Sequence, residues 1–347
     1  MIVKEETIKF AIIGCGHIGK RHAAMIKQHP EAEVVALCDI KPKENLDLAG
    51  FIHLPFYNSI NTLLKNHPES RVINICTPNA LHADQAIIAL QANKSVVIEK
   101  PMDISSEKCR EVIEESRRMN KQVFCVMQNR YSPPSVWLKN IMEEKRLGKI
   151  YMVQINCFWN RDERYYHKHT WKGTKKLDGG TLFTQFSHFI DMMFWLFGDI
   201  KNIRSTFHNF SHNGLTEFED SGYINFDFVE EGTGSFNFTT SVYDKNLESS
   251  ITIIGEKGTI KVGGQYMNEV VYCNIKDYTM PELAPSNPPN DYGYYKGSAA
   301  NHHFIIENVV DTLKGRSRAT TTAEEGMQVV DMIERMIKAG KKHLLPF

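Results

Sequence analysis

The stretch Phe10–Gly19, FAIIGCGHIG, decides the fold of this chain. Its apolar start is typical of a buried parallel strand, and it runs directly into glycines at positions 14, 16 and 19, with a helix expected from Arg21 to Gln28. In this spacing Gly14 allows a tight turn, Gly16 lets the backbone approach a pyrophosphate, and Gly19 allows close packing of helix on strand. The pattern predicts a dinucleotide site whose phosphates meet the free N–H groups at the helix start.

An acidic residue after the next strand favours NAD as the cofactor. Asp39 follows Gly19 by twenty residues and closes the apolar run Val34–Leu37. A carboxylate in this place accepts hydrogen bonds from the adenosine ribose hydroxyls and repels a 2′-phosphate. We therefore expect NAD rather than NADP, although the nearby Lys41 brings a positive charge that would suit a phosphate.

The composition argues against several classes of protein. Lys+Arg and Asp+Glu number 41 each, so no net charge draws the chain to nucleic acid or to an anionic membrane. Seven scattered cysteines without a C-x-x-C pair indicate buried thiols in a reducing compartment rather than a zinc site. The charged N-terminus does not resemble a signal peptide, and no apolar run approaches the roughly twenty residues of a membrane span. We expect a soluble, cytoplasmic protein without metal, nucleic-acid or membrane partners.

Two patterns of secondary structure divide the chain. Residues 1–128 are expected to form an NAD-binding Rossmann domain, because strands and helices alternate there. The expected strands are 8–13, 33–38, 52–56, 71–76, 95–99 and 122–128, with helices at 20–28, 43–49, 59–66, 82–92 and 105–119. Residues 129–347 are dominated by strand-like runs, which predicts an α+β domain with a large open, mostly antiparallel sheet for substrate binding and oligomerisation. The stretch 278–298 is expected to be a loop, and the last helices, 301–314 and 323–339, are free to pack back on the Rossmann domain.

Two short motifs end buried strands of the expected Rossmann sheet. CTPN at residues 76–79, followed by His82, lies at the carboxyl edge of the sheet, where open α/β folds bind ligands. The alternative is an ordinary turn in which Asn79 caps a helix. EKP at residues 99–101 follows the next strand, and Lys100 is either a proton acceptor beside the cofactor or a solvated surface lysine.

A third motif opens a helix of the second domain. DGG at residues 178–180 precedes an apolar helix expected over residues 181–197. Thr184, His188 and Asp191 are spaced four and three residues apart, which would put them on one face of that helix. A histidine in such a helix is either part of a site or an ordinary core residue.

Together these motifs resemble the Gfo/Idh/MocA oxidoreductase family. The order GxGxxG, TPNxxH, EKP and GG(x)7HxxD extends over nearly the whole chain. The resemblance implies an NAD-dependent dehydrogenase in which Lys100 and His188 face the nicotinamide, with a Lys100–Pro101 bond that is often cis. The expected cofactor-binding residues are Gly14, Gly16, His17, Ile18, Gly19, Asp39, Thr77, Asn79, His82, Glu99, Lys100 and Gln128.

A closer resemblance concerns the substrate. The runs MQNRYSPP and YYHKHTWKGTKKLDGGT, among others, are similar to UDP-N-acetylglucosaminuronate 3-dehydrogenases, which start the pathway to the 2,3-diamino-uronic acid sugars of bacterial surface glycans. This resemblance implies oxidation of the sugar at C3, with Lys100 or His188 as the base, and homo-oligomers, commonly tetramers. Thr184 stands where relatives carry asparagine or aspartate, and Phe186 replaces a small residue. The fold and the cofactor therefore carry over better than the exact substrate.

The polar loop Arg161–Lys176 offers the cations and aromatic rings that a nucleotide-sugar uronate needs. The basic residues in and near it are Arg130, Arg161, Arg164, Lys168, Lys172, Lys175 and Lys176. The expected substrate-binding residues are Arg161, Tyr166, Trp171, Lys172, Thr184, Gln185 and His188. Two alternatives stay open: a dehydrogenase of the same fold acting on a polyol, inositol or aldose, which would not need this loop, and a non-catalytic NAD-binding regulator, which would not need both Lys100 and His188.

Overall fold

The computed structural model describes residues 6–167 and 170–341 of the chain. Two compact units make it up: Met1–Met127 with His302–Val330, and Gln128–Asn301 with Asp331–Phe347. Helix α10 (Ala323–Lys341) contributes residues to both units. None of the helices in the described ranges has the length and apolar character that crossing a bilayer requires.

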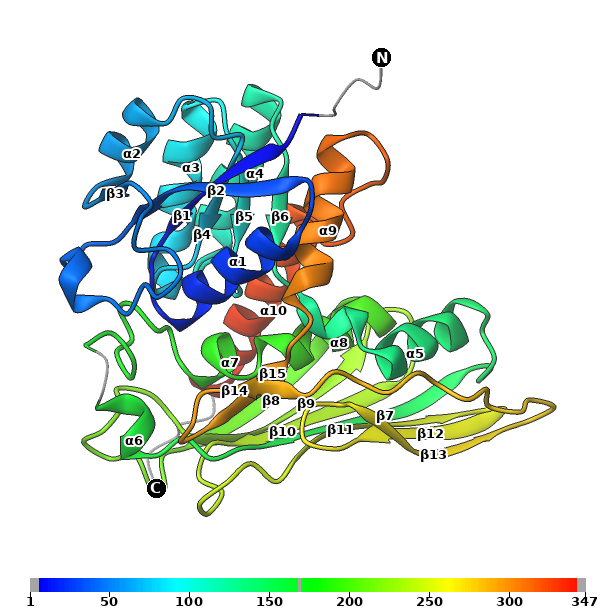
Figure 1. Ribbon diagram of the computed structural model, residues 1–347. Coiled ribbons are helices and arrows are strands. Elements are labelled where there is room, and N and C mark those ends of the chain that lie inside the picture. Colours follow the sequence, from blue (N-terminus) through cyan, green and yellow to red (C-terminus); the bar gives the residue numbers. More distant parts are fainter. Residues whose placement is uncertain (1–5, 168–169, 342–347) are drawn as a thin grey trace. The chain divides into compact units, whose positions relative to one another are not determined.

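The first unit is built on a six-stranded parallel sheet in the order β3-β2-β1-β4-β5-β6 (Figure 1). The strands are β1 (Ile8–Ile13), β2 (Ala32–Cys38), β3 (Phe56–Tyr57), β4 (Val72–Ile75), β5 (Ser95–Ile98) and β6 (Val123–Cys125). Every residue of β4, β5 and β6 is buried, as expected for parallel strands covered on both faces. The predicted Rossmann sheet is confirmed.

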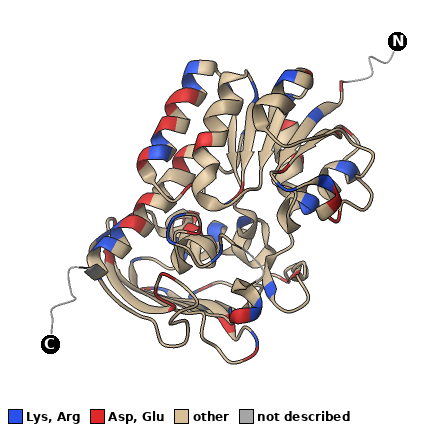
Figure 2. Cartoon of the chain, turned by 90° about the vertical axis from the view of Figure 1, so that its left-hand side faces the viewer, with Lys and Arg blue, Asp and Glu red and all other residues tan. Residues whose placement is uncertain are grey.

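Helices cover this sheet, and acidic and basic residues are mixed along them (Figure 2). They are α1 (His17–Gln28), α2 (Ile60–Asn66), α3 (His82–Gln91), α4 (Ser106–Met119) and α9 (His302–Leu313). Helix α1 packs beside α9, and α3 packs beside α4. At the start of α10, the Thr322 hydroxyl accepts the N–H of Glu325, whose carboxylate accepts the N–H of Thr322 in return.

The helix expected over residues 43–49 is wrong. Only a 3₁₀ turn, Lys43–Asn45, forms there. The segment begins after Pro42 and its only large apolar residues are Leu46 and Leu48, so it lacks the apolar stripe that would hold a longer helix on the sheet.

The second unit is built on a seven-stranded sheet in the order β13-β12-β11-β7-β10-β9-β8. Its strands are β7 (Ile150–Phe158), β8 (Ile200–His208), β9 (Ser221–Phe228), β10 (Thr233–Thr239), β11 (Glu248–Gly255), β12 (Gly258–Gly263) and β13 (Glu269–Ile275). Only the β7–β10 pair of this sheet is parallel, so the predicted large, mostly antiparallel sheet is confirmed. Helices α5 (Pro133–Glu143), α7 (Thr181–Thr184) and α8 (Ser187–Phe197) lie on one side of it (Figure 1).

The single helix expected over residues 181–197 is wrong, because α7 and α8 are separate. The break falls at Phe186, which is fully buried against Trp159 and Phe238, with ring centroids 5.6 Å apart in both pairs. Because the helix is interrupted at Phe186, Thr184 is the last residue of α7 and does not belong to α8. The spacing predicts that Thr184 and His188 share one helical face, and this prediction is wrong because the two residues lie on different helices.

The stretch expected to be a loop, residues 278–298, ends in a short two-stranded sheet. Its strands are β14 (Pro289–Asp291) and β15 (Lys296–Ala299). A one-turn helix, α6 (Glu163–Tyr166), forms within the polar loop that follows β7, where the Asp162 carboxylate accepts the N–H of Arg164.

Candidate active site

The glycine-rich loop between β1 and α1 contains two glycines that the chain itself requires. A side-chain Cβ on Gly14, whose φ is +88°, would lie 2.6 Å from the carbonyl oxygen of Cys76, and a Cβ on Gly19 would lie 1.8 Å from that of Gly14. A Cβ on Gly16 would instead meet nothing within 4 Å. The space beside Gly16, at the start of α1, is therefore open to a ligand group such as a phosphate.

Asp39 braces this loop from the end of β2. Its Oδ2 accepts the N–H of Cys15 at 2.8 Å, and its Oδ1 accepts the N–H of Lys41 at 2.9 Å. The carboxylate is half-buried, so it holds the loop and also remains accessible beside it. His17 and Ile18 form the first turn of α1, next to the open space.

The motif after β4 is fixed internally by hydrogen bonds. The buried ring of His82 lies 2.8 Å from the carbonyl oxygens of both Thr77 and Pro101, so both of its nitrogens are occupied within the protein. The Thr77 hydroxyl donates to the Gln85 side chain at 2.7 Å. His82 thus joins the ends of β4 and β5 rather than presenting a ring nitrogen to a cofactor. Asn79 begins a 3₁₀ turn and is not the N-cap of α3, so the capping alternative is wrong.

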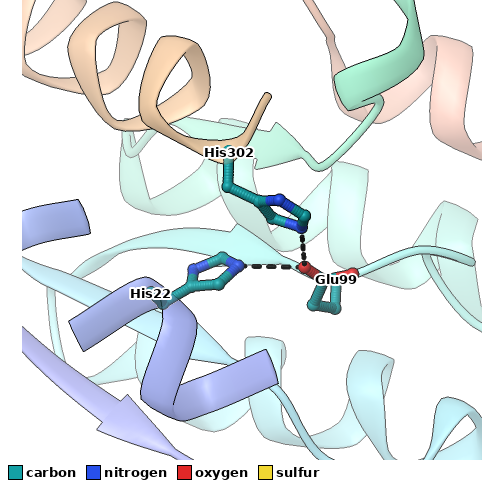
Figure 3. Close-up of side chains that lie close together, drawn as sticks. All are labelled: His22, Glu99 and His302. Atoms are coloured by element: carbon teal, nitrogen blue, oxygen red, sulfur yellow. Dashed lines mark hydrogen bonds and ion pairs between the residues drawn. The ribbon is translucent and has the colours of Figure 1, made fainter. Parts of the chain in front are cut away.

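The EKP motif after β5 contains two charged residues that differ in burial. The Lys100–Pro101 bond is cis, and Lys100 is half-buried. The Glu99 carboxylate is buried. It accepts hydrogen bonds from His22 Nε2 at 2.9 Å and from the backbone N–H of Lys100 at 3.1 Å. Figure 3 shows the rings of His22 and His302 both directed at it. Burial raises the pKa of Glu99, but the hydrogen bonds from the two histidines outweigh burial and hold that pKa well below its usual range.

His22 and His302 are the residues of this cluster that sequence reasoning missed. One nitrogen from each ring and one Glu99 oxygen lie within 4.8 Å of one another, a group that could in principle hold a metal ion. The Glu99–His22 separation of 2.9 Å is that of a hydrogen bond, shorter than the roughly 3.3 Å between ligands of a tetrahedral zinc ion. A usable signal existed for His22, which lies three residues after Gly19 on the buried face of α1.

In the second unit, His188 lies on α8 and is 5% exposed. Asp191, one turn further, is buried in an ion pair with Arg130, whose Nη2 and Nε lie 2.6 and 2.9 Å from its two oxygens. The Trp195 ring lies against the same guanidinium, 5.3 Å from it. Arg130 and Asp191 therefore neutralise each other in the core, and Arg130 is not a candidate for binding a phosphate.

Arg161, expected to contact the substrate, is buried inside its own loop. Its guanidinium donates to the Asn246 side chain at 3.1 Å and to the Lys296 carbonyl at 2.9 Å. Trp159 and Tyr295 face it, with ring centres 4.7 and 4.8 Å away. This arginine joins three segments of the second unit, so its role in the geometry is to shape the loop.

The rest of the polar loop is organised around Tyr165. Lys172 Nζ lies 3.6 Å from the centre of the Tyr165 ring, and Gln185 donates to the Tyr165 hydroxyl at 3.2 Å. Tyr166 is buried in the same cluster, whereas Trp171 is half-buried. Lys168 lies outside the described residues.

Thr184 and Gln128 also have internal contacts. The Thr184 hydroxyl donates to the carboxylate of Asp178, which also accepts the N–H of Gly173 at 2.7 Å. Thr184 therefore closes the turn between the DGG motif and α7. Gln128 is buried, and its carbonyl accepts the side-chain N–H of Asn301 at 3.2 Å.

Both units match known family models. Residues 8–127 match a model described as an oxidoreductase family with an NAD-binding Rossmann fold. Residues 139–343 match the C-terminal alpha/beta domain of the oxidoreductase family.

Three known proteins are informative relatives. The WlbA dehydrogenase of Chromobacterium violaceum, solved with NADH and UDP-GlcNAcA, is 30% identical with a TM-score of 0.87, covering 99% of this chain and 97% of that one. The WlbA dehydrogenase of Bordetella pertussis, solved with the same ligands, is 30% identical with a TM-score of 0.84, covering 99% and 100%. Inositol 2-dehydrogenase of Salmonella typhimurium is 30% identical over 263 residues, 73% of each protein.

Proposed function

Because the chain belongs to the Gfo/Idh/MocA oxidoreductase family of NAD-dependent dehydrogenases, we propose that it oxidises C3 of UDP-N-acetylglucosaminuronate. The observation that carries this proposal is the extent of the similarity to the two WlbA structures that hold UDP-GlcNAcA, which covers 99% of the chain. The inositol dehydrogenase is equally identical but aligns with only 73%. A 3-keto nucleotide sugar for surface-glycan biosynthesis would be the product.

The first unit has the features that NAD binding needs. Gly16 leaves open space at the start of α1, where backbone N–H groups can receive the pyrophosphate. Asp39 lies beside this loop and would accept hydrogen bonds from the ribose hydroxyls. NAD, when bound, supplies the acceptor for the hydride that leaves the sugar carbon.

The chain's own residues then have to take the hydroxyl proton as the ketone forms. We propose Lys100 and His188 for the two polar roles at that hydroxyl, one accepting the proton and the other holding the oxygen by a hydrogen bond. An ordinary lysine has a pKa of about 10.4 and must lose its proton before it can act as a base, whereas an ordinary histidine, at about 6.5, is mostly neutral at pH 7. The pH–rate profiles of variants at the two positions distinguish these roles.

The polar loop of the second unit is the proposed binding element for the anionic nucleotide. Lys172 brings a positive charge to the face of the Tyr165 ring, and Trp171 offers a ring for stacking. Arg161 supports this element from inside, since its donors are directed at Asn246 and Lys296. A homo-oligomer, dimer or tetramer, is part of the proposal, and light scattering measures it.

A substrate panel tests the proposal. UDP-N-acetylglucosaminuronate, UDP-N-acetylglucosamine, free N-acetylglucosamine and inositol are each offered with NAD, and NADH absorbance is followed. We expect kcat/KM to be highest for the uronate, because its diphosphate and carboxylate bind far from the reacting carbon and position it. A matched variant, Lys172→Met, should weaken turnover of the UDP-sugars and leave any turnover of inositol unchanged.

Two other results would replace the proposal. Inositol or a free aldose surpassing every UDP-sugar would make the chain a polyol or sugar dehydrogenase of the same family. NADH binding without turnover of any compound in the panel would favour a regulator.

A further inference from the structure

A cluster of four buried polar side chains crosses the core of the first unit. Asn74 on β4, His22 on α1, Glu99 directly after β5 and His302 at the start of α9 are each at most 5% exposed. Asn74 Nδ2 lies 2.7 Å from His22 Nδ1, and His22 Nε2 lies 2.9 Å from Glu99 Oε1. His302 Nε2 lies 3.5 Å from the same oxygen (Figure 3). Four segments that are distant in the sequence are thereby connected to one carboxylate.

The protonation states in this cluster follow from its partners. An ionised carboxylate only accepts hydrogen bonds, so the His22 nitrogen that faces Glu99 is a donor. His302 Nε2 faces the same oxygen at the longer distance of 3.5 Å. At its other nitrogen, His22 accepts a hydrogen bond from the Asn74 side-chain amide. Burial lowers the pKa of His302 against the opposing effect of Glu99, so this ring is neutral. Glu99, whose pKa is held well below its usual range, therefore keeps its charge between the two rings.

Stability alone is a weak reason for such a cluster. Buried charged groups with their partners can often be replaced by apolar side chains of similar volume without loss of stability. The second oxygen of Glu99 has a more specific contact, because it accepts the backbone N–H of Lys100 at 3.1 Å. The cluster thus ends on the residue that the proposed function uses.

We propose that His22 and His302 are positioning residues that act through Glu99, fixing the carboxylate that holds the backbone of Lys100. The inference rests on the proposed function in so far as Lys100 is the catalytic lysine. His22 lies on α1, the helix that starts at the glycine-rich loop. One hydrogen bond therefore connects the dinucleotide-binding helix with the strand end that carries the lysine.

Helix α9 offers a matched control, because it is anchored at both ends. His302 reaches Glu99 from its first residue. Just beyond its last residue, Lys314 Nζ and Arg316 Nη1 lie 2.5 and 2.6 Å from the two oxygens of Glu31. Both anchors hold the helix, but of the two only His302 contacts the carboxylate next to Lys100. A purely structural role would make their removal equivalent.

The first experiment needs no sugar substrate. Hydrogen exchange of the segment 97–102 and the melting temperature are measured with NADH bound, for the wild type and for His302→Leu, His302→Gln and Glu31→Gln. We expect His302→Leu to speed exchange in this segment about tenfold or more, since the Lys100 amide loses a fixed acceptor. His302→Gln should restore protection, because its amide nitrogen can replace Nε2. Glu31→Gln should lower the melting temperature and leave the segment protected.

The second experiment measures the reaction. With UDP-N-acetylglucosaminuronate, kcat of His302→Leu should fall by about 10- to 100-fold with KM little changed, as expected when a reacting group is displaced by about 1 Å. His302→Gln should recover most of that loss. His22→Leu should lower kcat and also weaken NADH binding, because His22 lies on α1. If His302→Leu does not fold, His302→Asn replaces it, since the shorter amide cannot reach Glu99.

Each outcome decides the inference. Unchanged exchange at 97–102 in His302→Leu, or an equal change in Glu31→Gln, overturns it. One equivalent of zinc in the purified wild type that His302→Leu lacks also overturns it, by making the three side chains metal ligands. Faster exchange in His302→Leu, together with a wild type that oxidises no sugar, would refute the proposed function while supporting the positioning role of the cluster.

Discussion

Replacing Gly16 by alanine should separate cofactor binding from folding. The backbone of Gly16 has φ −69° and ψ −165°, which alanine adopts readily, and an added Cβ would meet no protein atom within 4 Å. Replacing a glycine in such a conformation typically stabilises a protein by about 0.4–1 kcal/mol through the unfolded state. The melting temperature of Gly16→Ala should therefore equal or slightly exceed that of the wild type.

The methyl group would, however, occupy the space proposed for the pyrophosphate. Losing one hydrogen bond to a charged phosphate costs about 1.5–3 kcal/mol, which corresponds to a roughly 10- to 140-fold higher Kd. Fluorescence titration with NADH measures this change. Gly19→Ala is the matched control, because its Cβ would overlap the Gly14 carbonyl oxygen at 1.8 Å and should lower the melting temperature itself. Wild-type NADH affinity in Gly16→Ala would refute the placement of the phosphates at this loop.

Three further results are expected. Lys100→Met should lower kcat by at least about 100-fold with NADH affinity nearly unchanged, since general acid–base catalysis is worth about 10²–10⁴-fold; a variant with a tenth of the wild-type rate would exclude an essential base. NADH should bind more tightly than NADPH, because Asp39 would repel a 2′-phosphate, and Asp39→Asn should narrow the ratio of the two dissociation constants measured by fluorescence. The pKa of His302 is lowered on folding, so its contribution to stability is complete above about pH 6.5 and is lost below it. The free energy of unfolding, measured with urea, should therefore fall less between about pH 6.5 and pH 5 in His302→Gln than in the wild type. The difference should be up to about 1.4 kcal/mol per pH unit.

Sequence spacing identified the parts of the site that are local. The glycines at 14, 16 and 19 and the carboxylate of Asp39 are each tied to one turn or one strand end, so a fixed offset in the sequence suffices to find them. The alternation of strands and helices likewise predicted the parallel sheet.

The side-chain roles that depend on distant partners could not be predicted in this way. Glu99 follows β5 as expected, but its partner His22 is 77 residues away in the sequence. Arg161 belongs to a loop rich in cations, but its guanidinium donates to Asn246 and Lys296, which are 85 and 135 residues further on in the sequence. Phe186 broke an apparently continuous apolar helix, because its ring packs on Trp159 rather than following the helical period.

In the proposed reaction, hydride leaves C3 of UDP-N-acetylglucosaminuronate, so a deuterium label at that carbon should pass to the cofactor. The sugar labelled with deuterium at C3 is incubated with the enzyme and NAD, and the NADH formed is analysed by mass spectrometry. We predict NADH carrying one deuterium and a slower hydride-transfer step with the labelled sugar. Unlabelled NADH would place the oxidation at another carbon, and the absence of any NADH would contradict this substrate altogether.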